Sequence, residues 1–582
     1  MVKGMTQQVE ATGREIDDAI AVLRAHKDEW ARLPVPKKIA FLIRMRRAAR
    51  DVAAEWVAAA TRAKGIPESS PLAGEEWTSG PWALIFAINR YVETLRDIAR
   101  VGVPQLRPSR VRTRADGQVV VDVFPLNVYD DLLVNGVTAE VWMQPGVTTD
   151  TLADTMVVFY KQRNPRGKVA LVLGAGNIAS IPPLDVLYKL VAEGQVCVLK
   201  MNPVNDYLGP FFERIFAPLI AAGYVQIVYG GAGVGTTLSS HEGVDEIHMT
   251  GSDKTHDAIV FGTGEAGTAR KRANQPITDK RVTGELGNVS PTIVVPGPWS
   301  AADLAFQAEH IATQKMHNAG FNCIAAQVLV LPESWDKTSA LLDAVRATPR
   351  ATPPRDEYYP GAAARQRAFV AARPDAETFD RPDEVDPPRT LITGLDAGDR
   401  DEVCFRTEAF DDVLTGTTLP GADAAQFLRN AVAFCNDTLW GTLGANILIH
   451  PTTIRQLGPA FEEAIAALRY GCVAVNAWTG VGFLLAQTSW GAYPGHTPDD
   501  VQSGIGVVHN TFLFDRPQKS VIRAPFAPFP RGVSRGEFST LPRPPWFITN
   551  KQAHNIGRRL TRFEADPGLK HLPGIFVDAL RG

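Results

Sequence analysis

The sequence has no long hydrophobic run, few cysteines and almost no net charge, and each of these absences excludes a class of protein. No window reaches the ~18 unbroken apolar residues that a membrane-spanning helix needs. The five cysteines form no CxxC pair and no Cys/His cluster with zinc spacing, so neither a disulfide framework nor a metal site is expected. A net charge of −3 leaves no basic surface for nucleic acid.

The first 15 residues are polar and lack the apolar segment of a signal peptide. Together with the scattered cysteines, this predicts a reducing, cytoplasmic setting. The 582 residues exceed what one hydrophobic core organises, so we expect two or three domains. The apolar fraction of 45% and the charged fraction of 21% are those of an ordinary globular protein.

Helical periodicity dominates the start of the chain, and strand periodicity follows it. Apolar residues recur at helical spacing in residues 16–64, with a break at 33–36, and again in residues 81–101. From residue 118 the apolar period changes to two. We expect strands at 119–124, 138–143 and 156–162. Strands of this kind, set outside an α/β core, are typical of an arm that pairs subunits.

Residues 168–252 alternate continuous apolar runs with helical segments, which predicts a doubly wound parallel sheet. Ligands of such sheets bind beyond the carboxyl ends of the strands. The residues at those ends are Asn177, Lys200, Gly230 and Ser252. The segment contains no complete G-x-G-x-x-G fingerprint, because Gly174-Ala175-Gly176 lacks the third glycine, so the fingerprint alone predicts no dinucleotide site.

A candidate nucleophile, Cys323, lies in a loop ahead of the buried apolar run 328–331. A thiolate attacks carbonyl carbon well, although a lone cysteine is more often a small buried hydrophobic residue. Later segments continue the α/β pattern, with late strands expected at 512–514 and 520–523. Residues 348–390 are rich in Pro, Arg and Asp and predict an exposed insertion, and the tail after residue 530 holds a basic amphipathic helix near 551–563.

Taken in order, these short segments resemble the aldehyde dehydrogenase superfamily from about residue 167 to about residue 521. Each is weak alone, and their shared order over some 350 residues carries the resemblance; the interval of 23 residues from Asn177 to Lys200 is as the family has it. The segments are Gly176-Asn177, Lys200, residues 240–245, Thr250-Gly251-Ser252, Glu285-Leu286-Gly287, Gly320 to Cys323, Glu408-Ala409-Phe410, Asn436-Asp437-Thr438 with Gly441, and Val475-Asn476.

The resemblance implies an α/β fold with a Rossmann-like nucleotide-binding domain, an α/β catalytic domain and a small β oligomerisation arm that builds a homodimer or homotetramer. The implied divisions are a helical region 1–117 belonging to the nucleotide-binding domain, an arm 118–166, the nucleotide-binding domain 167–284, a catalytic domain 285–500 with insertion 348–390, return strands 501–530 and a C-terminal extension 531–582.

The resemblance also assigns the chemistry. Cys323 would attack the aldehyde, and the thioester left after hydride transfer would be hydrolysed by water that Glu285 activates. The side-chain amide of Asn177 would hold the oxyanion, where one donor is typically worth ~3 kcal/mol. The plain alternatives are a solvated turn residue for Glu285 and an Asx turn for Asn177.

A nicotinamide cofactor, NAD or NADP, is implied in the same way. Lys200 and Glu408 match the family's contacts to the two riboses, and Ser252 matches a pyrophosphate contact at a helix N-terminus. Gly230, Gly251 and Phe410 complete the expected cofactor site. The plain alternatives are a surface lysine at a strand end for Lys200 and a solvated loop acid for Glu408.

Departures from the family pattern leave the cofactor and the reaction open. Pro203 stands where many NAD-preferring members carry an acid, so a 2′-phosphate is less repelled. Asn202-Pro203 is similar to the CoA-linked branch, which includes fatty acyl-CoA reductases, but that branch commonly lacks the acid found here as Glu285. His256 and Phe321 are also unusual for the family and motivate a further alternative, a non-catalytic scaffold.

Oxidation of a small-molecule aldehyde to a carboxylic acid is therefore favoured over a CoA-dependent acylating reaction and over a scaffold. The sequence does not define the aldehyde. Aromatic residues near the expected tunnel suggest a bulky apolar or aromatic one, although aromatic side chains in such places more often belong to the core. These residues are Phe321, Trp478, Phe483 and Trp490.

Overall fold

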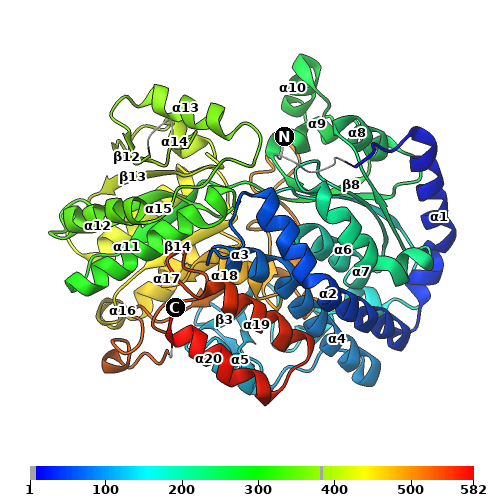
Figure 1. The fold of residues 1–582 in the computed structure, drawn as a ribbon, viewed down its shortest axis with the longest axis horizontal. Helices are drawn as coiled ribbons and strands as arrows, with labels where there is room; N and C mark the ends of the chain where they lie inside the picture. Colours follow the sequence, from blue (N-terminus) through cyan, green and yellow to red (C-terminus); the bar gives the residue numbers. More distant parts are fainter. Residues whose placement is uncertain (1–7, 381–384, 540) are drawn as a thin grey trace.

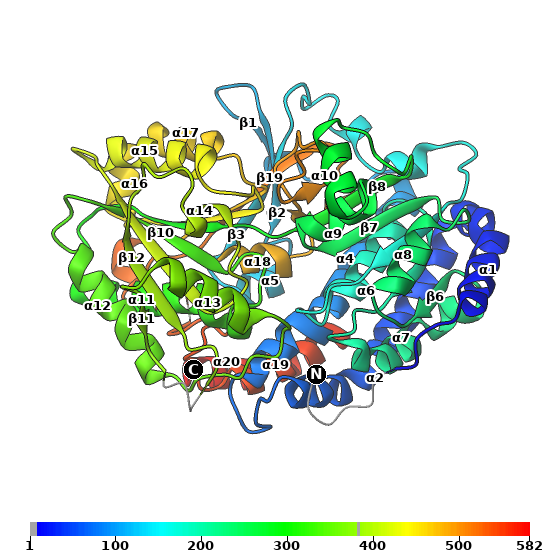
Figure 2. The same cartoon turned by 90° about the horizontal axis from the view of Figure 1, so that it is seen from above.

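Two helix-covered parallel sheets organise the chain and lie in separate lobes (Figure 1, Figure 2). The computed structural model describes residues 8–380, 385–539 and 541–582. Both sheets have the continuous apolar strands that burial on two faces requires, and the predicted α/β fold class is confirmed.

The first sheet holds six strands of the described chain in the order β17-β8-β7-β4-β5-β6. Their bounds are Gly504–Ile505, Arg281–Leu286, Glu246–Gly251, Val169–Leu173, Val196–Lys200 and Val225–Val228. All pairs are parallel except β17 with β8. The covering helices are α6 (Ile181–Val191), α7 (Gly209–Ala221), α8 (Ala232–Ser240), α9 (Asp253–Val260) and α10 (Gly264–Arg272). Strand β8 crosses the predicted division at residue 285, so this sheet carries Glu285.

The second sheet joins eleven strands of the described residues in one ladder, in the order β1-β2-β3-β19-β15-β14-β9-β10-β13-β12-β11. Their bounds are Val111–Thr113, Val119–Phe124, Thr138–Met143, Pro517–Arg523, Cys472–Val475, Gly444–Leu448, Ser290–Val294, Ala326–Pro332, Val413–Leu419, Thr390–Leu395 and Glu377–Thr378. Strand β19 pairs in parallel with β15 and antiparallel with β3, so the strands β1 to β3 extend the sheet of the second lobe.

Helices of the second lobe cover this sheet, and a short ribbon of β16 (Ser489–Trp490) and β18 (Val508–His509) lies beside it. The helices are α11 (Ala301–Met316), α12 (Thr338–Ala351), α13 (Ala362–Ala372), α14 (Val403–Arg406), α15 (Ala424–Asp437), α16 (Pro451–Leu457), α17 (Pro459–Ala467) and α18 (Thr479–Leu484). None of the helices in the described ranges is both long and apolar enough to cross a membrane.

The predicted N-terminal helices are present as α1 (Gly13–Arg32), α2 (Val35–Ala63) and α4 (Ala83–Val101). A capping box at Thr12 and Glu15 begins α1, and the expected break lies between α1 and α2. Helix α2 packs between α4 and α7, which attaches this region to the first sheet. The short helices α3 (Ala73–Trp77) and α5 (Val128–Leu133) complete it.

Three local predictions are wrong. Residues 156–162 form no strand; Val158–Lys161 is a 3₁₀ turn entered through Val157, whose φ of 53° breaks an extended run. Residues 512–514 form no strand either, because Leu513 has a φ of 56°. The insertion 348–390 contains the helix α13 and the strand β11, and buried residues of α13 attach it to the lobe. The polar composition of the insertion as a whole did not reveal the short buried face of α13.

The C-terminal extension packs on the body of the protein as α19 (Ala553–Ala565) and α20 (Leu572–Leu580), the red helices of Figure 1. Helix α19 contacts α3 where both have glycine. A Cβ on Gly74 would lie 2.5 Å from the carbonyl carbon of Ala553, and a Cβ on Gly557 would lie 2.7 Å from Cβ of Trp77. At these two glycines the backbones of α3 and α19 therefore approach more closely than any side chain allows. Asn89 of α4 also donates to Glu564 Oε2 of α19 at 3.0 Å.

We expect Gly74→Ala to destabilise the protein by about 1–3 kcal/mol, because the added methyl overpacks the contact between α3 and α19. The matched control is Gly235→Ala in α8, where a Cβ would meet nothing within 4 Å. That substitution should be neutral or stabilising, since alanine is the better helix former. Thermal unfolding of both variants tests the contact, and an unchanged midpoint for Gly74→Ala would contradict it.

Candidate active site

The candidate site lies between the carboxyl end of β8 in the first sheet and the loops that lead into β10 and β13 of the second sheet. Strand β8 brings Glu285 from the first sheet, and the loop between α11 and β10 brings Cys323 from the second lobe. Helix α18 lies between the two lobes in Figure 2. Trp478, which precedes α18, donates from Nε1 to the carbonyl of Ile324 at 3.3 Å and so contacts the cysteine loop directly.

The backbone before Cys323 has an unusual conformation. Asn318 and Ala319 have φ values of 56° and 52°, and Gly320 follows at 76°. Consecutive left-handed residues other than glycine are unfavourable unless surrounding contacts hold them. A Cβ on Gly320 would collide with the backbone of Asp411, so only glycine fits there. The loop is thus fixed by packing on both sides before it reaches the half-buried thiol of Cys323.

Glu285 is a buried carboxyl group that faces Cys323. Burial raises the pKa of Glu285 to about 8, against smaller opposing effects of the Cys323 thiol and the Trp490 indole. Its Oε1 has no hydrogen-bond partner among the described residues. Burial also raises the pKa of the Cys323 thiol well above its ordinary value, and the nearby Glu285 adds to the rise. Burial and mutual proximity thus disfavour the charged form of both groups.

Asn177 follows β4 and reaches the same loop. Its side-chain Nδ2 donates to the carbonyl of Phe321 at 2.9 Å, two residues before the thiol. The side chain is buried, with 5% of its surface exposed. The structure therefore brings Asn177, Cys323 and Glu285 together, as the sequence predicts for an oxyanion donor, a nucleophile and a base.

Behind this group lies a buried ammonium that sequence reasoning missed. Lys64, at the end of α2, donates to Glu76 Oε1 at 2.7 Å, to the Asn318 side-chain oxygen at 3.0 Å and to the Asn177 carbonyl at 3.2 Å. Only 3% of the Lys64 side chain is exposed, and 1% of that of Glu76. No sequence signal links residues that lie 113 and 254 positions apart.

A second buried pair supports the same loop from the insertion. Arg355 donates to Glu75 Oε2 at 2.7 Å, and Glu75 in turn accepts from the backbone N–H of Asn318 at 3.1 Å. Burial alone would raise the pKa of Glu75, but the Arg355 guanidinium outweighs it and the pKa lies below its usual value. The hydroxyl of Tyr358 donates to the Asn177 carbonyl at 3.0 Å and completes the network.

Glu408 lies against Gly287, where a Cβ would collide with its carboxylate. Its Oε1 accepts from the Asn288 N–H at 3.3 Å, and burial raises its pKa to about 8. Phe410 adopts a φ of 45° and packs on Phe321, with ring centroids 5.7 Å apart. These residues, placed by the sequence among the cofactor contacts, thus lie beside the cysteine loop.

The loop that carries Glu408 and Phe410 is held from the insertion. Arg365 of α13 donates to the carbonyls of Ala409 at 2.9 Å and Phe410 at 3.1 Å. Tyr359, just before α13, packs edge-on against Phe410 at 5.0 Å. The insertion therefore closes one side of the site.

The other predicted cofactor residues form a separate group along the first sheet. Lys200 ends β5, Gly230 follows β6, and Gly251 ends β7 ahead of Ser252, which caps α9. The Lys200 side chain is buried, whereas Ser252 is exposed with its Oγ accepting from the Thr255 N–H at 3.2 Å. A buried ammonium at the end of β5 and a helix N-terminus after β7, both at the carboxyl edge of the sheet, are chemically suited to the ribose and the phosphates of a dinucleotide.

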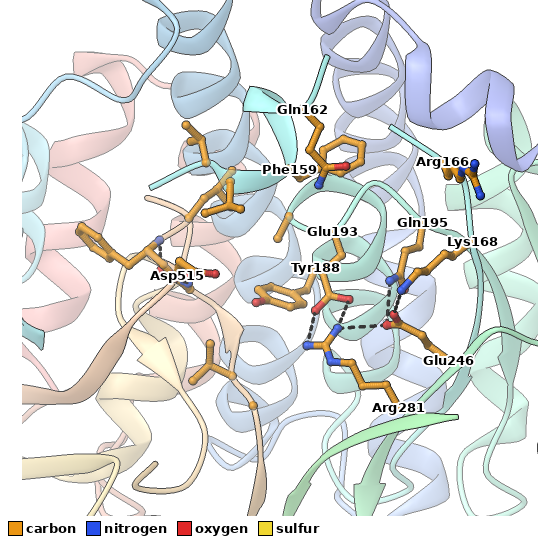
Figure 3. Close-up of a pocket in the computed structure, with 18 residues that line it drawn as sticks. Phe159, Gln162, Arg166, Lys168, Tyr188, Glu193, Gln195, Glu246, Arg281 and Asp515 are labelled. Atoms are coloured by element: carbon orange, nitrogen blue, oxygen red, sulfur yellow. Dashed lines mark hydrogen bonds and ion pairs between the residues drawn. The ribbon is translucent and has the colours of Figure 1, made fainter. Parts of the chain in front are cut away.

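Alternative sites among the described residues would be a metal cluster or a charged hollow on the first sheet. The described residues contain no cluster of three or more His, Cys, Asp or Glu side chains that could hold a metal. A cavity of about 460 Å³ lies at the opposite, amino-terminal ends of the strands of the first sheet (Figure 3). Its charges are paired with one another, as Arg281 is with Glu193 at 3.1 Å and with Glu246 at 3.0 Å.

Comparison with known sequences finds a family match over part of the chain. The sequence model described as the aldehyde dehydrogenase family matches residues 138–372. Aldehyde dehydrogenase LUC3 of a Fusarium species is 28% identical over 181 residues, which are 30% of this chain and 33% of that protein. The N-succinylglutamate 5-semialdehyde dehydrogenase of Novosphingobium aromaticivorans is 30% identical over 175 residues, or 30% of this chain and 34% of that enzyme. The aligned part thus spans about a third of these relatives.

Solved structures share the fold over most of the chain. A Mycobacterium tuberculosis aldehyde dehydrogenase complexed with NAD+ superposes with a TM-score of 0.60 at 18% identity and covers 88% of this chain and 91% of that one. A gamma-glutamyl-gamma-aminobutyraldehyde dehydrogenase from Burkholderia cenocepacia gives 0.57 at 21% identity, with 88% and 90% covered. The sequence match over residues 138–372, the shared fold and the cysteine loop thus agree in their similarity to aldehyde dehydrogenases.

Proposed function

We propose that this protein oxidises an aldehyde to a carboxylic acid with a nicotinamide dinucleotide. The observation that carries the proposal is the buried carboxyl of Glu285 facing the thiol of Cys323. The names of the relatives, all aldehyde dehydrogenases, support the reaction class, and the NAD+ complex of a structural neighbour supports the cofactor class.

The chain's own residues supply each proton transfer. Cys323 Sγ bonds to the aldehyde carbon as its proton passes to the Glu285 carboxylate, giving a thiohemiacetal. The Asn177 amide and the Cys323 backbone N–H hold the oxygen during attack. A bound nicotinamide ring would accept the hydride, leaving a thioester on Cys323. After Glu285 has released its proton to solvent, it accepts one from the water that cleaves the thioester, which frees the acid and the thiol.

The residues along the first sheet would hold the dinucleotide. Lys200 and Glu408 would each meet a ribose, and the α9 N-terminus at Ser252, with Gly230 and Gly251 leaving room for backbone approach, would meet the pyrophosphate. Phe410 would contact the nicotinamide ring. We further propose a homodimer or homotetramer built through the arm β1 to β3, in the cytoplasm, where all five free cysteines stay reduced.

Turnover measured as reduced-nicotinamide absorbance tests this reaction with NAD+ and NADP+ separately, on short, long and aromatic aldehydes. We expect turnover without CoA that is lost in Cys323→Ala, because the proposed thioester forms on the thiol that this substitution removes. Cys435→Ala, a buried cysteine of α15, is the matched control and should retain activity. A strict requirement for CoA would move the reaction to the acylating class, and inactivity on every aldehyde would favour a scaffold.

The pH dependence of kcat should follow Glu285. Its pKa of about 8 means that the carboxylate fraction rises with pH through this value, so kcat should rise and then level off above pH 8. Glu285→Gln should remove this rise and lower kcat by about 100-fold, the usual contribution of a general base. Glu408→Gln is the control and should keep the rise while weakening dinucleotide binding. A rise near pH 8 that survives in Glu285→Gln would contradict the assignment.

Lys64 should act as a positioning residue for the cysteine loop. In Lys64→Met the Glu76 carboxylate is left buried and unpaired, so stability should fall by about 3–5 kcal/mol. The double variant Lys64→Met/Glu76→Gln leaves no unpaired charge and should recover most of that stability. It should still show a reduced kcat and slower alkylation of Cys323 with dinucleotide affinity unchanged, because Asn318 and Asn177 have lost their shared donor. Full activity in the double variant would exclude this role.

A further inference from the structure

The described chain begins with a segment that crosses the edge of the first sheet where the proposed function places a ribose. The backbone N–H of Gln8 donates to Asp206 Oδ2 at 3.3 Å, and that of Ala11 donates to the carbonyl of Tyr229 at 3.0 Å. Between them, Glu10 Oε1 accepts from the N–H of Gly231 at 3.2 Å. Residues 8–11 therefore lie over the carboxyl ends of β5 and β6.

This segment brings a carboxylate to Lys200. Burial lowers the pKa of the Lys200 ammonium, and Glu10 and Asp206 both counteract that effect through their negative charge, so both carboxylates lie close to the ammonium. A third acid, Glu213, accepts from the Tyr229 hydroxyl at 2.6 Å on the same edge. These acids surround Lys200 with negative charge, although Pro203 stands where many NAD-preferring members of the resembled family carry an acid.

The side chain of Glu10 keeps acceptor capacity for a ligand. It is exposed, and the Gly231 N–H is its one hydrogen-bond donor among the described residues. In dinucleotide folds, an acid at the end of a strand accepts a hydrogen bond from the 2′-hydroxyl of the adenosine ribose, and it repels a 2′-phosphate. Gly230 has a φ of 137°, and a Cβ placed on it would lie 2.9 Å from Glu10 Cγ. The acid therefore lies directly on the turn after β6.

We propose that Glu10, delivered by the segment before α1, selects NAD+ over NADP+ at Lys200. The inference rests on the proposed function for the identity of the site as a dinucleotide site. In this proposal Glu10 takes the place of the acid that is missing after β5. Glu10 lies about 190 residues before Lys200 in the sequence.

Binding of NADH and NADPH, each followed by nucleotide fluorescence on the full chain, tests the inference without requiring an aldehyde. The wild-type protein should bind NADH more tightly than NADPH. Glu10→Gln should reduce the ratio of the two Kd values by about tenfold, chiefly by tightening NADPH, because one negative charge near the 2′-phosphate has gone. Glu10→Asp should keep most of the preference.

The matched control is Asp18→Asn, which removes the same charge from an exposed position in α1 and should leave the ratio unchanged. Equal affinity for the two nucleotides in the wild type, or an unchanged ratio in Glu10→Gln, would overturn the inference while leaving a dinucleotide site intact. Failure to bind either nucleotide would overturn it together with the proposed function. Selective binding without aldehyde turnover would support it and contradict only the proposed reaction.

Discussion

The buried ammonium of Lys64 is the contact on which the site depends most directly. It joins the end of α2, the loop after β4 and the loop before Cys323 through three hydrogen bonds to oxygen atoms. A buried charge is expensive unless its partners are well placed, so these segments are held in one arrangement. The left-handed backbone at Asn318 persists because this network compensates for its strain.

Through Glu76, the same contact connects the cysteine loop to helices from both ends of the chain. Glu76 and Glu75 belong to α3, and α3 is pressed against α19 of the C-terminal extension by the paired glycines Gly74 and Gly557. The helix behind the cysteine loop is therefore fixed from both termini. Regions that lie outside the clear family resemblance thus form the rear wall of the site.

Exclusion of water gives the site its electrostatic character. Glu285 and Glu408 both have pKa values raised to about 8, mainly by burial. The aromatic side chains from the insertion contribute to that burial, since Tyr359 covers Phe410 and Tyr358 covers Phe321 at 4.9 Å. Near neutral pH both groups are held toward their uncharged forms, and the Glu285 carboxylate that the proposed reaction needs as a proton acceptor becomes more populated as the pH rises through about 8.

The roles of Asn177, Cys323 and Glu285 rest on the resemblance of short ordered segments to a family and stay predictions. Local patterns were sufficient for the two sheets, because strand periodicity records them directly. They failed at residues 156–162 and 512–514, where single left-handed residues override a strand-like composition. They also could not find Lys64 or Glu10. A lysine at a helix end and an acid in a polar leader look like surface residues, and only tertiary packing brings them to the site.

The position of residues 8–11 has a consequence for how such a protein diverges. The segment touches the first sheet by backbone hydrogen bonds to Asp206 and Tyr229 and contributes no strand to it. Changes there leave the hydrogen-bonded ladder of the sheet and the apolar core untouched. Under the proposed function, substitutions in these few residues would change the choice between NAD and NADP without disturbing the packing of the rest of the protein.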